Sequence, residues 1–134
     1  MTNKIIISQV FTRLFGNDTS NCRPNGSKAE NGCGRFSDFT QKALLDIKAL
    51  GATHIWYTGI IEHATQTGYE EFGIHPDHPA IVKGKAGSPY AIKDYYDVDP
   101  DLAGKPNERM KEFQNLVSRT HKAGLKIIID FVPN

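Results

Sequence analysis

The sequence predicts an α/β fold in which parallel strands alternate with helices. Three β-rich segments, Lys4–Phe15, Thr53–Thr58 and the run that begins at Lys126, are separated by two segments with helical spacing of apolar residues. Near-continuous apolar strands are typical of a parallel sheet with both faces covered. Right-handed crossovers place every strand-to-helix loop at the carboxyl edge of such a sheet. The long polar loops of this chain fall at that edge, so we expect a functional site there.

Composition places the chain in the class of soluble globular domains. The 134 residues are 39% hydrophobic and 23% charged, and the formal net charge is +1. A nearly neutral chain offers no electrostatic attraction for nucleic acid or an anionic membrane, so we expect neither partner. No apolar run is long enough to span a bilayer, and no secretory leader is visible, which favours a cytoplasmic location.

Capping residues mark both predicted helices. After a loop rich in Gly and Asn from 16 to 35, the first helix is expected to begin at Thr40, whose hydroxyl can cap free amides, and to end at Gly51. The second is expected to be capped by Asn107 and to end at Gly124. Their predicted apolar faces are Ala43, Leu44, Ile47 and Leu50 in the first helix, and Met110, Phe113, Val117 and Thr120 in the second.

Two features leave alternatives open. Cys22 and Cys33 lie in the Gly/Asn-rich loop and are either free thiols or a disulfide that closes it. The connection from 59 to 105 is unusually long, which indicates function or local structure. It contains His63, His75 and His78, but no convincing further zinc ligands accompany them.

Three segments resemble the α-amylase family of glycoside hydrolases. Residues 50–59 (LGATHIWYTG) resemble that family's second barrel strand, and residues 90–100 (YAIKDYYDVDP) resemble the segment before its second helix. Residues 119–134 end in DFVPN, which resembles the first conserved region of the family, Asp-x-Val-x-Asn-His. The chain departs from the family where Gly59 stands for a usual Pro and Pro89 for a usual Gly, and it lacks the His that follows Asn134.

The resemblance implies a TIM-type (β/α)8 barrel, of which residues 1–134 are a partial catalytic domain with about three strands and two helices. It implies a retaining enzyme acting on α-glucosidic bonds of starch-like glucans or oligosaccharides. The family's catalytic carboxylates follow strands four, five and seven, so no catalytic residue is expected before Asn134. The alternatives are a non-catalytic carbohydrate-binding or scaffold protein on the same barrel, and another sugar-acting barrel such as a trehalose-forming enzyme.

Four residues match functional positions of the family. Tyr90 resembles the tyrosine that stacks on the sugar in this family. The alternative is that its side chain simply packs within the long loop. Asp94 is expected to brace this loop or, alternatively, to touch sugar. Asp130 is expected to support the site from within the barrel, without the fourth-strand arginine that pairs with it in the family. Asn134 resembles the amide that binds calcium in many members of the family. The resemblance therefore implies calcium as a possible cofactor of the full-length protein. It implies no calcium for this chain alone.

The remaining expectations concern the other side chains and the chain as a whole. Trp56 and Tyr57 are expected to lie in the core or line the barrel, and the three histidines to contact sugar or to be solvated loop residues. An unclosed barrel leaves the apolar faces of residues 5–7 and 127–129 partly exposed. We therefore expect the chain alone to aggregate or oligomerise, because its partner is the rest of its own barrel. We also expect no turnover of starch or maltooligosaccharides.

Overall fold

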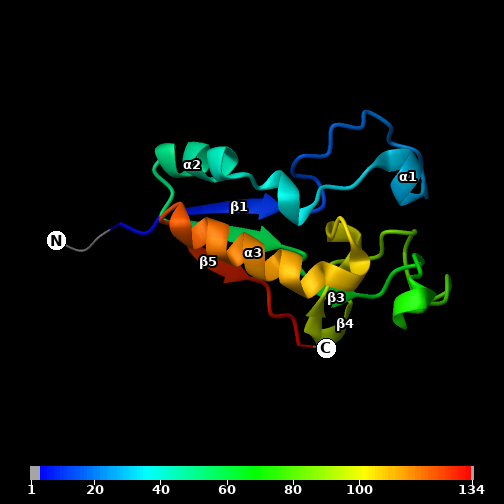
Figure 1. Ribbon diagram of the computed structural model, residues 1–134. Helices are drawn as coiled ribbons and strands as arrows, with labels where there is room; N and C mark the ends of the chain where they lie inside the picture. Colours follow the sequence, from blue (N-terminus) through cyan, green and yellow to red (C-terminus); the bar gives the residue numbers. More distant parts are fainter. Residues whose placement is uncertain (1–3, 134) are drawn as a thin grey trace.

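A three-stranded parallel sheet forms the centre of the protein. The computed structural model describes residues 4–133. The sheet contains β1 (Ile7–Phe11), β2 (His54–Thr58) and β5 (Lys126–Ile129) in the order β1-β2-β5. Both neighbouring pairs are parallel, which confirms the sequence prediction. In Figure 1, α2 (Gln41–Ala49) and α3 (Arg109–Lys122) lie beside the sheet, and the long loops lie at the end toward which β1 points.

Both predicted helices are present; the start of α2 and the C-terminal ends of both helices are as expected. The Thr40 hydroxyl accepts a hydrogen bond from the Ala43 amide at 3.1 Å, so Thr40 caps α2 as predicted. Gly51 and Gly124 follow the last turns of α2 and α3 with φ of +97° and +76°, a conformation that favours glycine. A third, shorter helix, α1 (Lys28–Asn31), lies in the Gly/Asn-rich loop, where Ser27 and Glu30 form a capping box.

The prediction that Asn107 caps α3 is wrong. A 3₁₀ turn, η4 (Pro106–Glu108), precedes this helix, and no side chain caps its first residue. Instead, the Glu112 carboxylate reaches back to accept from the amides of Gly104 and Lys105, at 2.9 and 2.8 Å. Glu112 thereby holds the loop before α3 against the start of the helix, and a carboxylate near the helix N-terminus also interacts favourably with the helix dipole.

The hydrophobic core lies between the sheet and the two helices. Tyr57 of β2 is fully buried, and its ring meets that of Phe39 edge-on at 4.9 Å. Because the Thr120 hydroxyl donates its one hydrogen to the Leu116 carbonyl, the Tyr57 hydroxyl must donate to Thr120, at 2.7 Å. This confirms Tyr57 as a core residue. Among the described residues, the other large apolar side chains that are fully buried are Phe36, Phe39, Leu44, Ile55, Ile60, Leu102, Leu116 and Leu125.

β1 is shorter and more exposed than predicted. A strand buried on both faces was expected over residues 4–15, but β1 spans five residues in which exposed and partly buried positions alternate. The reason is its place at an edge of the sheet, where among the described residues only β2 pairs with it. Ile5, Ile7 and Ile129 are 67%, 49% and 41% exposed, which confirms the expected exposure of apolar faces at both edges.

The long connection after β2 contains its own secondary structure. β3 (Ile61–His63) pairs antiparallel with β4 (Ile92–Val98), with irregular register between them. The connection also contains the 3₁₀ turns η2 (Glu70–Phe72) and η3 (Pro100–Leu102), and a further 3₁₀ turn, η1 (Phe36–Asp38), precedes α2. The length of the connection predicted function or local structure, and its strands and turns are local structure, although the pairing of β3 with β4 was not predicted. Within residues 4–133, no helix has both the length and the apolar character needed to cross a membrane.

Candidate functional site

A shallow hollow lies where β1 and β2 end. It has a volume of about 380 Å³ and is lined by Gln9, Phe11, Thr58, Pro89 and Tyr90. The Gln9 side chain donates to the Thr58 hydroxyl at 2.9 Å, which joins the two strands at the floor of the hollow. Tyr90 is half exposed, so its ring is accessible to a ligand. The structure thus brings Tyr90 to the carboxyl edge of the sheet, while its contact with sugar stays a prediction.

Asp130 joins the end of β5 to the end of β2. Its Oδ1 accepts from Trp56 Nε1 at 2.8 Å, and its Oδ2 accepts from the Gly59 amide at 3.1 Å. The chain thus gives Asp130 two donors besides the fourth-strand arginine that the family resemblance implies for it. The neighbouring strand supplies two donors, which satisfy both carboxylate oxygens and fix their orientation.

Gly59 connects Asp130 to the hollow. Its φ is +81°, and a Cβ at this position would lie 3.1 Å from Pro89 Cβ and 3.2 Å from Phe11 Cε2. The backbone thus passes closely between two residues that line the hollow, an approach that glycine permits at least cost. This explains why the chain has glycine here, where the resembling family usually has proline.

Asp94 lies on β4 and is exposed. Its Oδ1 accepts from the Tyr96 amide at 2.8 Å, a local bond that supports the expected bracing role. In register opposite Asp94 is Glu62 of β3, which is buried. Burial, followed by the charge of Asp97, raises the pKa of Glu62. Asp97 in turn is held by the Arg109 guanidinium, with Arg109 Nε 2.9 Å from Asp97 Oδ1.

The metal prediction cannot be placed on the structure, because Asn134 lies outside the described residues. In the range 4–133, no group of three or more His, Cys, Asp and Glu side chains gathers as metal ligands would. His75 and His78 are exposed, as expected of loop residues. His63 is buried, so its description as a solvated loop residue is wrong. Its Nε2 lies 3.0 Å from the Ala86 carbonyl oxygen, so the ring contacts the segment before Tyr90.

A buried ionic cluster lies beside β1 and β4, and sequence analysis missed it. Arg13 Nη1 is 2.7 Å from Asp101 Oδ2 and 3.9 Å from Asp99 Oδ2. Tyr69 donates its hydroxyl hydrogen to Asp101 Oδ1 at 2.5 Å. His63 Nε2 lies 3.9 Å from Asp99 Oδ2, an oxygen without a hydrogen-bond partner among the described residues. The cluster joins residues up to 88 positions apart, which no local pattern can indicate.

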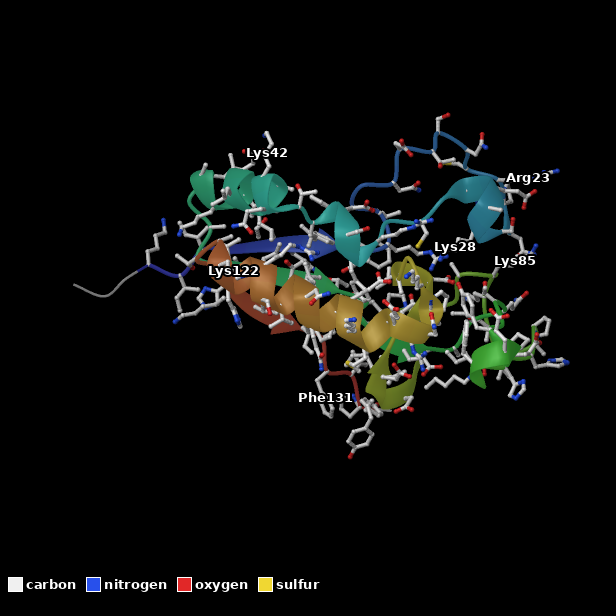
Figure 2. The ribbon with its side chains drawn as sticks, viewed as in Figure 1. Arg23, Lys28, Lys42, Lys85, Lys122 and Phe131 are labelled. Carbon is white, nitrogen blue, oxygen red and sulfur yellow. The ribbon has the colours of Figure 1, made fainter. Side chains whose placement is uncertain are left out.

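The two buried aspartates of the cluster have opposite pKa shifts. Burial raises the pKa of Asp99, and the charge of Asp101 adds to this effect. Burial alone would also raise the pKa of Asp101, but the Arg13 charge and the Tyr69 hydroxyl lower it below its ordinary value. Asp101 is therefore the charged partner of Arg13. Lys28 of α1, labelled in Figure 2, adds a bond from its Nζ to the Asp101 carbonyl oxygen at 2.6 Å.

Both cysteines are free thiols, and they differ in environment. Cys22 is exposed, whereas the Cys33 thiol packs beside the ionic cluster and lies 3.2 Å from the Gly34 carbonyl oxygen. Burial raises the pKa of Cys33 to about 11.

We expect iodoacetamide at pH 8 to alkylate Cys33 about 200-fold more slowly in the folded protein than in urea, because the thiolate is the nucleophile. Peptide mass spectrometry measures each site, and Cys22 in the same sample is the control. Equal rates for Cys33 in both states would contradict its burial.

The fold and the position of the hollow define a class of protein. Parallel strands with intervening helices, and a polar and aromatic site at their carboxyl edge, are the architecture of a β/α barrel. Residues 9–134 match the family described as "Alpha amylase, catalytic domain". The chain belongs to this family, and it corresponds to the N-terminal portion of the barrel.

Individual relatives agree with this assignment over different lengths. The chain is similar to cyclomaltodextrin glucanotransferase of Bacillus licheniformis, with 29% identity over 140 aligned residues, 96% of this chain and 17% of that protein. It is 35% identical to an alpha-glucosidase of Apis mellifera over 74 residues, 55% of this chain and 12% of the relative. It is 47% identical to an amino acid transporter heavy chain of Rattus norvegicus over 45 residues, 34% of this chain and 6% of the relative.

Solved structures show the same barrel. Trehalose-6-phosphate hydrolase of Bacillus licheniformis superposes with a TM-score of 0.59 and 25% identity, covering 97% of this chain and 17% of that one. A maltogenic α-amylase of Thermotoga neapolitana gives a TM-score of 0.56 and 26% identity, with 95% and 22% covered. The chain spans less than a quarter of each of these proteins, so the activity of a whole protein is a proposal.

Proposed function

We propose that the chain contributes the sugar-stacking side of a glycosidase active site that acts on α-glucosidic bonds of starch-like glucans or oligosaccharides. The observation that carries this proposal is the hollow of Tyr90, Phe11, Gln9 and Thr58 at the carboxyl edge of the sheet. An accessible tyrosine ring suits the apolar C–H face of a pyranose, and nearby amide and hydroxyl groups suit its hydroxyls. Asp130, oriented by β2, supports this edge from within the barrel.

The chemistry proposed for the whole protein is retaining. One carboxylate attacks the anomeric carbon, and a second protonates the leaving oxygen and later activates water. Both carboxylates would come from residues outside this chain, whose own role is to bind and orient sugar. The amide oxygen of Asn134 is a suitable hard ligand for calcium in the whole protein, and its other ligands would also lie outside the chain.

Oligosaccharide binding tests the proposal. We expect Tyr90→Ala to weaken maltohexaose binding about tenfold, since a stacked aromatic ring contributes on the order of 1 kcal/mol. Tyr96→Ala is the matched control, because Tyr96 lies on β4 and is 93% exposed, away from the hollow. Isothermal titration calorimetry measures both variants. Equal affinities for Tyr90→Ala and the unaltered protein would contradict the role of Tyr90.

A second candidate is a barrel that binds but does not hydrolyse. It is favoured by the 47% identity to an amino acid transporter heavy chain, a name that describes no glycosidase activity. Assay of the protein encoded by the whole reading frame on maltooligosaccharides separates the two candidates. Release of sugar whose first-formed anomer is α, detected by proton NMR, supports the retaining enzyme. Binding without release supports the second candidate.

A further inference from the structure

His63 links three parts of the fold that are separate in sequence. It belongs to β3, its ring is almost completely buried, and its Nε2 lies 3.0 Å from the Ala86 carbonyl oxygen. The same nitrogen lies 3.9 Å from Asp99 Oδ2, which follows β4. The ring therefore stands between the segment that leads to Tyr90 and the buried ionic cluster.

Both ring nitrogens face carbonyl oxygens: Nε2 lies 3.0 Å from that of Ala86, and Nδ1 lies 3.3 Å from that of Ile61, the longer of the two contacts. A carbonyl oxygen only accepts hydrogen bonds, so the contact with Ala86 requires a hydrogen on Nε2. Asp99 Oδ2, which has no hydrogen-bond partner among the described residues, faces the same nitrogen at 3.9 Å and favours a hydrogen there as well. Arg13 and Asp101 complete the charged groups around Asp99. His63 is thus a donor to Ala86.

The segment that carries Tyr90 is attached at both of its ends. At the first end, His63 donates to Ala86. At the second, the Ala64 amide donates to the Ala91 carbonyl oxygen at 2.9 Å. Tyr90 lies between these two attachments, with Pro89 against Gly59. A loop fixed at both ends loses little further conformational freedom when a ligand stacks on it.

We propose that His63 is a positioning residue for Tyr90, acting through the bond from its Nε2 to the Ala86 carbonyl oxygen. This inference deepens the proposed function, because it assumes that Tyr90 is the platform on which sugar stacks. In this interpretation, a buried histidine that is distant from the hollow determines how well the hollow is formed before a ligand binds.

Two amide substitutions separate this role from simple packing. The side-chain nitrogen of glutamine replaces Nε2 of histidine, whereas that of asparagine replaces Nδ1 and falls short of Ala86. We expect His63→Asn to shift the Tyr90 signal in the fluorine NMR spectrum of 3-fluorotyrosine-labelled protein and to weaken maltohexaose binding about fivefold. We expect His63→Gln to restore both. The Tyr57 signal reports on the core and should stay unchanged in both variants.

The outcomes distinguish this inference from the function on which it rests. A Tyr90 shift in His63→Asn, restored in His63→Gln, supports the positioning role even if Tyr90→Ala leaves sugar affinity unchanged, in which case only the proposed function fails. Equal Tyr90 signals in all three proteins overturn the inference. A nitrogen-15 spectrum with the hydrogen on Nδ1 alone also overturns it, and this spectrum requires no sugar.

Discussion

Asp101→Ala is expected to destabilise the protein by about 3–5 kcal/mol, the usual cost of removing one partner of a buried ion pair. The Asp101 side chain is almost completely buried and accepts from Arg13 and Tyr69. Without it, the one carboxylate of residues 4–133 left within 4 Å of the Arg13 guanidinium is Asp99, at 3.9 Å, and the Tyr69 hydroxyl loses its acceptor. Urea unfolding at pH 7, followed by circular dichroism, measures the change in free energy.

An exposed pair provides the control for this substitution. Lys42 and Asp46 form an ion pair with an N–O distance of 2.5 Å, but their side chains are 84% and 64% exposed. Lys42 extends from α2 in Figure 2. Asp46→Ala should cost less than about 1 kcal/mol, since water screens such pairs. Similar costs for Asp46→Ala and Asp101→Ala would contradict the view that burial makes the cluster important.

The Asp101 contribution should also depend on pH in a defined direction. Because the folded protein lowers the pKa of Asp101, the unfolded chain binds this proton more readily. The contribution of Asp101 to the free energy of unfolding is fully present above the ordinary pKa of a carboxyl group. It is lost as the pH falls through the lower pKa that Asp101 has in the folded protein. Asp99 has the opposite shift, so acid titration of the unaltered protein mixes the two effects. The stability difference between the unaltered protein and Asp101→Asn contains the contribution of the charged Asp101, and it should shrink on acidification.

Local signals predicted the regular part of this fold. Thr40, Gly51 and Gly124 act through bonds to residues within a few positions, so their roles are visible in the sequence alone. The apolar runs that became β2 and β5 predicted parallel strands because the intervening segment had helical spacing. The same reasoning placed Asp130 and Tyr90 at one edge of the sheet, which is where the structure has them.

The remaining features depend on partners far away in the sequence. β4 has mostly exposed side chains, so it lacks the apolar alternation that marks a strand, and its pairing with β3 could not be predicted. Arg13 and Asp101 are charged residues that are buried only because they meet each other. The bonds that Asp130 accepts from Trp56 of β2 and from Gly59, which follows it, also join residues far apart in the sequence, so they were not predicted.

Gly87→Ala is expected to detach the segment that carries Tyr90. The φ of Gly87 is +67°, and a Cβ there would lie 1.8 Å from the Ala64 carbonyl oxygen. That atom belongs to the backbone and cannot rotate away, so the two segments must separate. The left-handed conformation costs about 1–2 kcal/mol for alanine, and the clash adds a cost of similar or larger size. Together these two costs favour local separation of the segment at Ala64 from the segment at Ala91.

Amide hydrogen exchange measures this opening directly. The Ala64 amide, which donates to Ala91, should exchange at least about a hundredfold faster in Gly87→Ala, the equivalent of about 3 kcal/mol. Gly73→Ala is the matched control, because Gly73 has φ of +77° but no atom within 4 Å of an added Cβ. It carries the conformational cost without the clash, so Ala64 exchange should stay unchanged. If both variants left Ala64 protected, the segment before Tyr90 would be more adaptable than its close contact with β3 implies, and preorganisation of the hollow would need another cause.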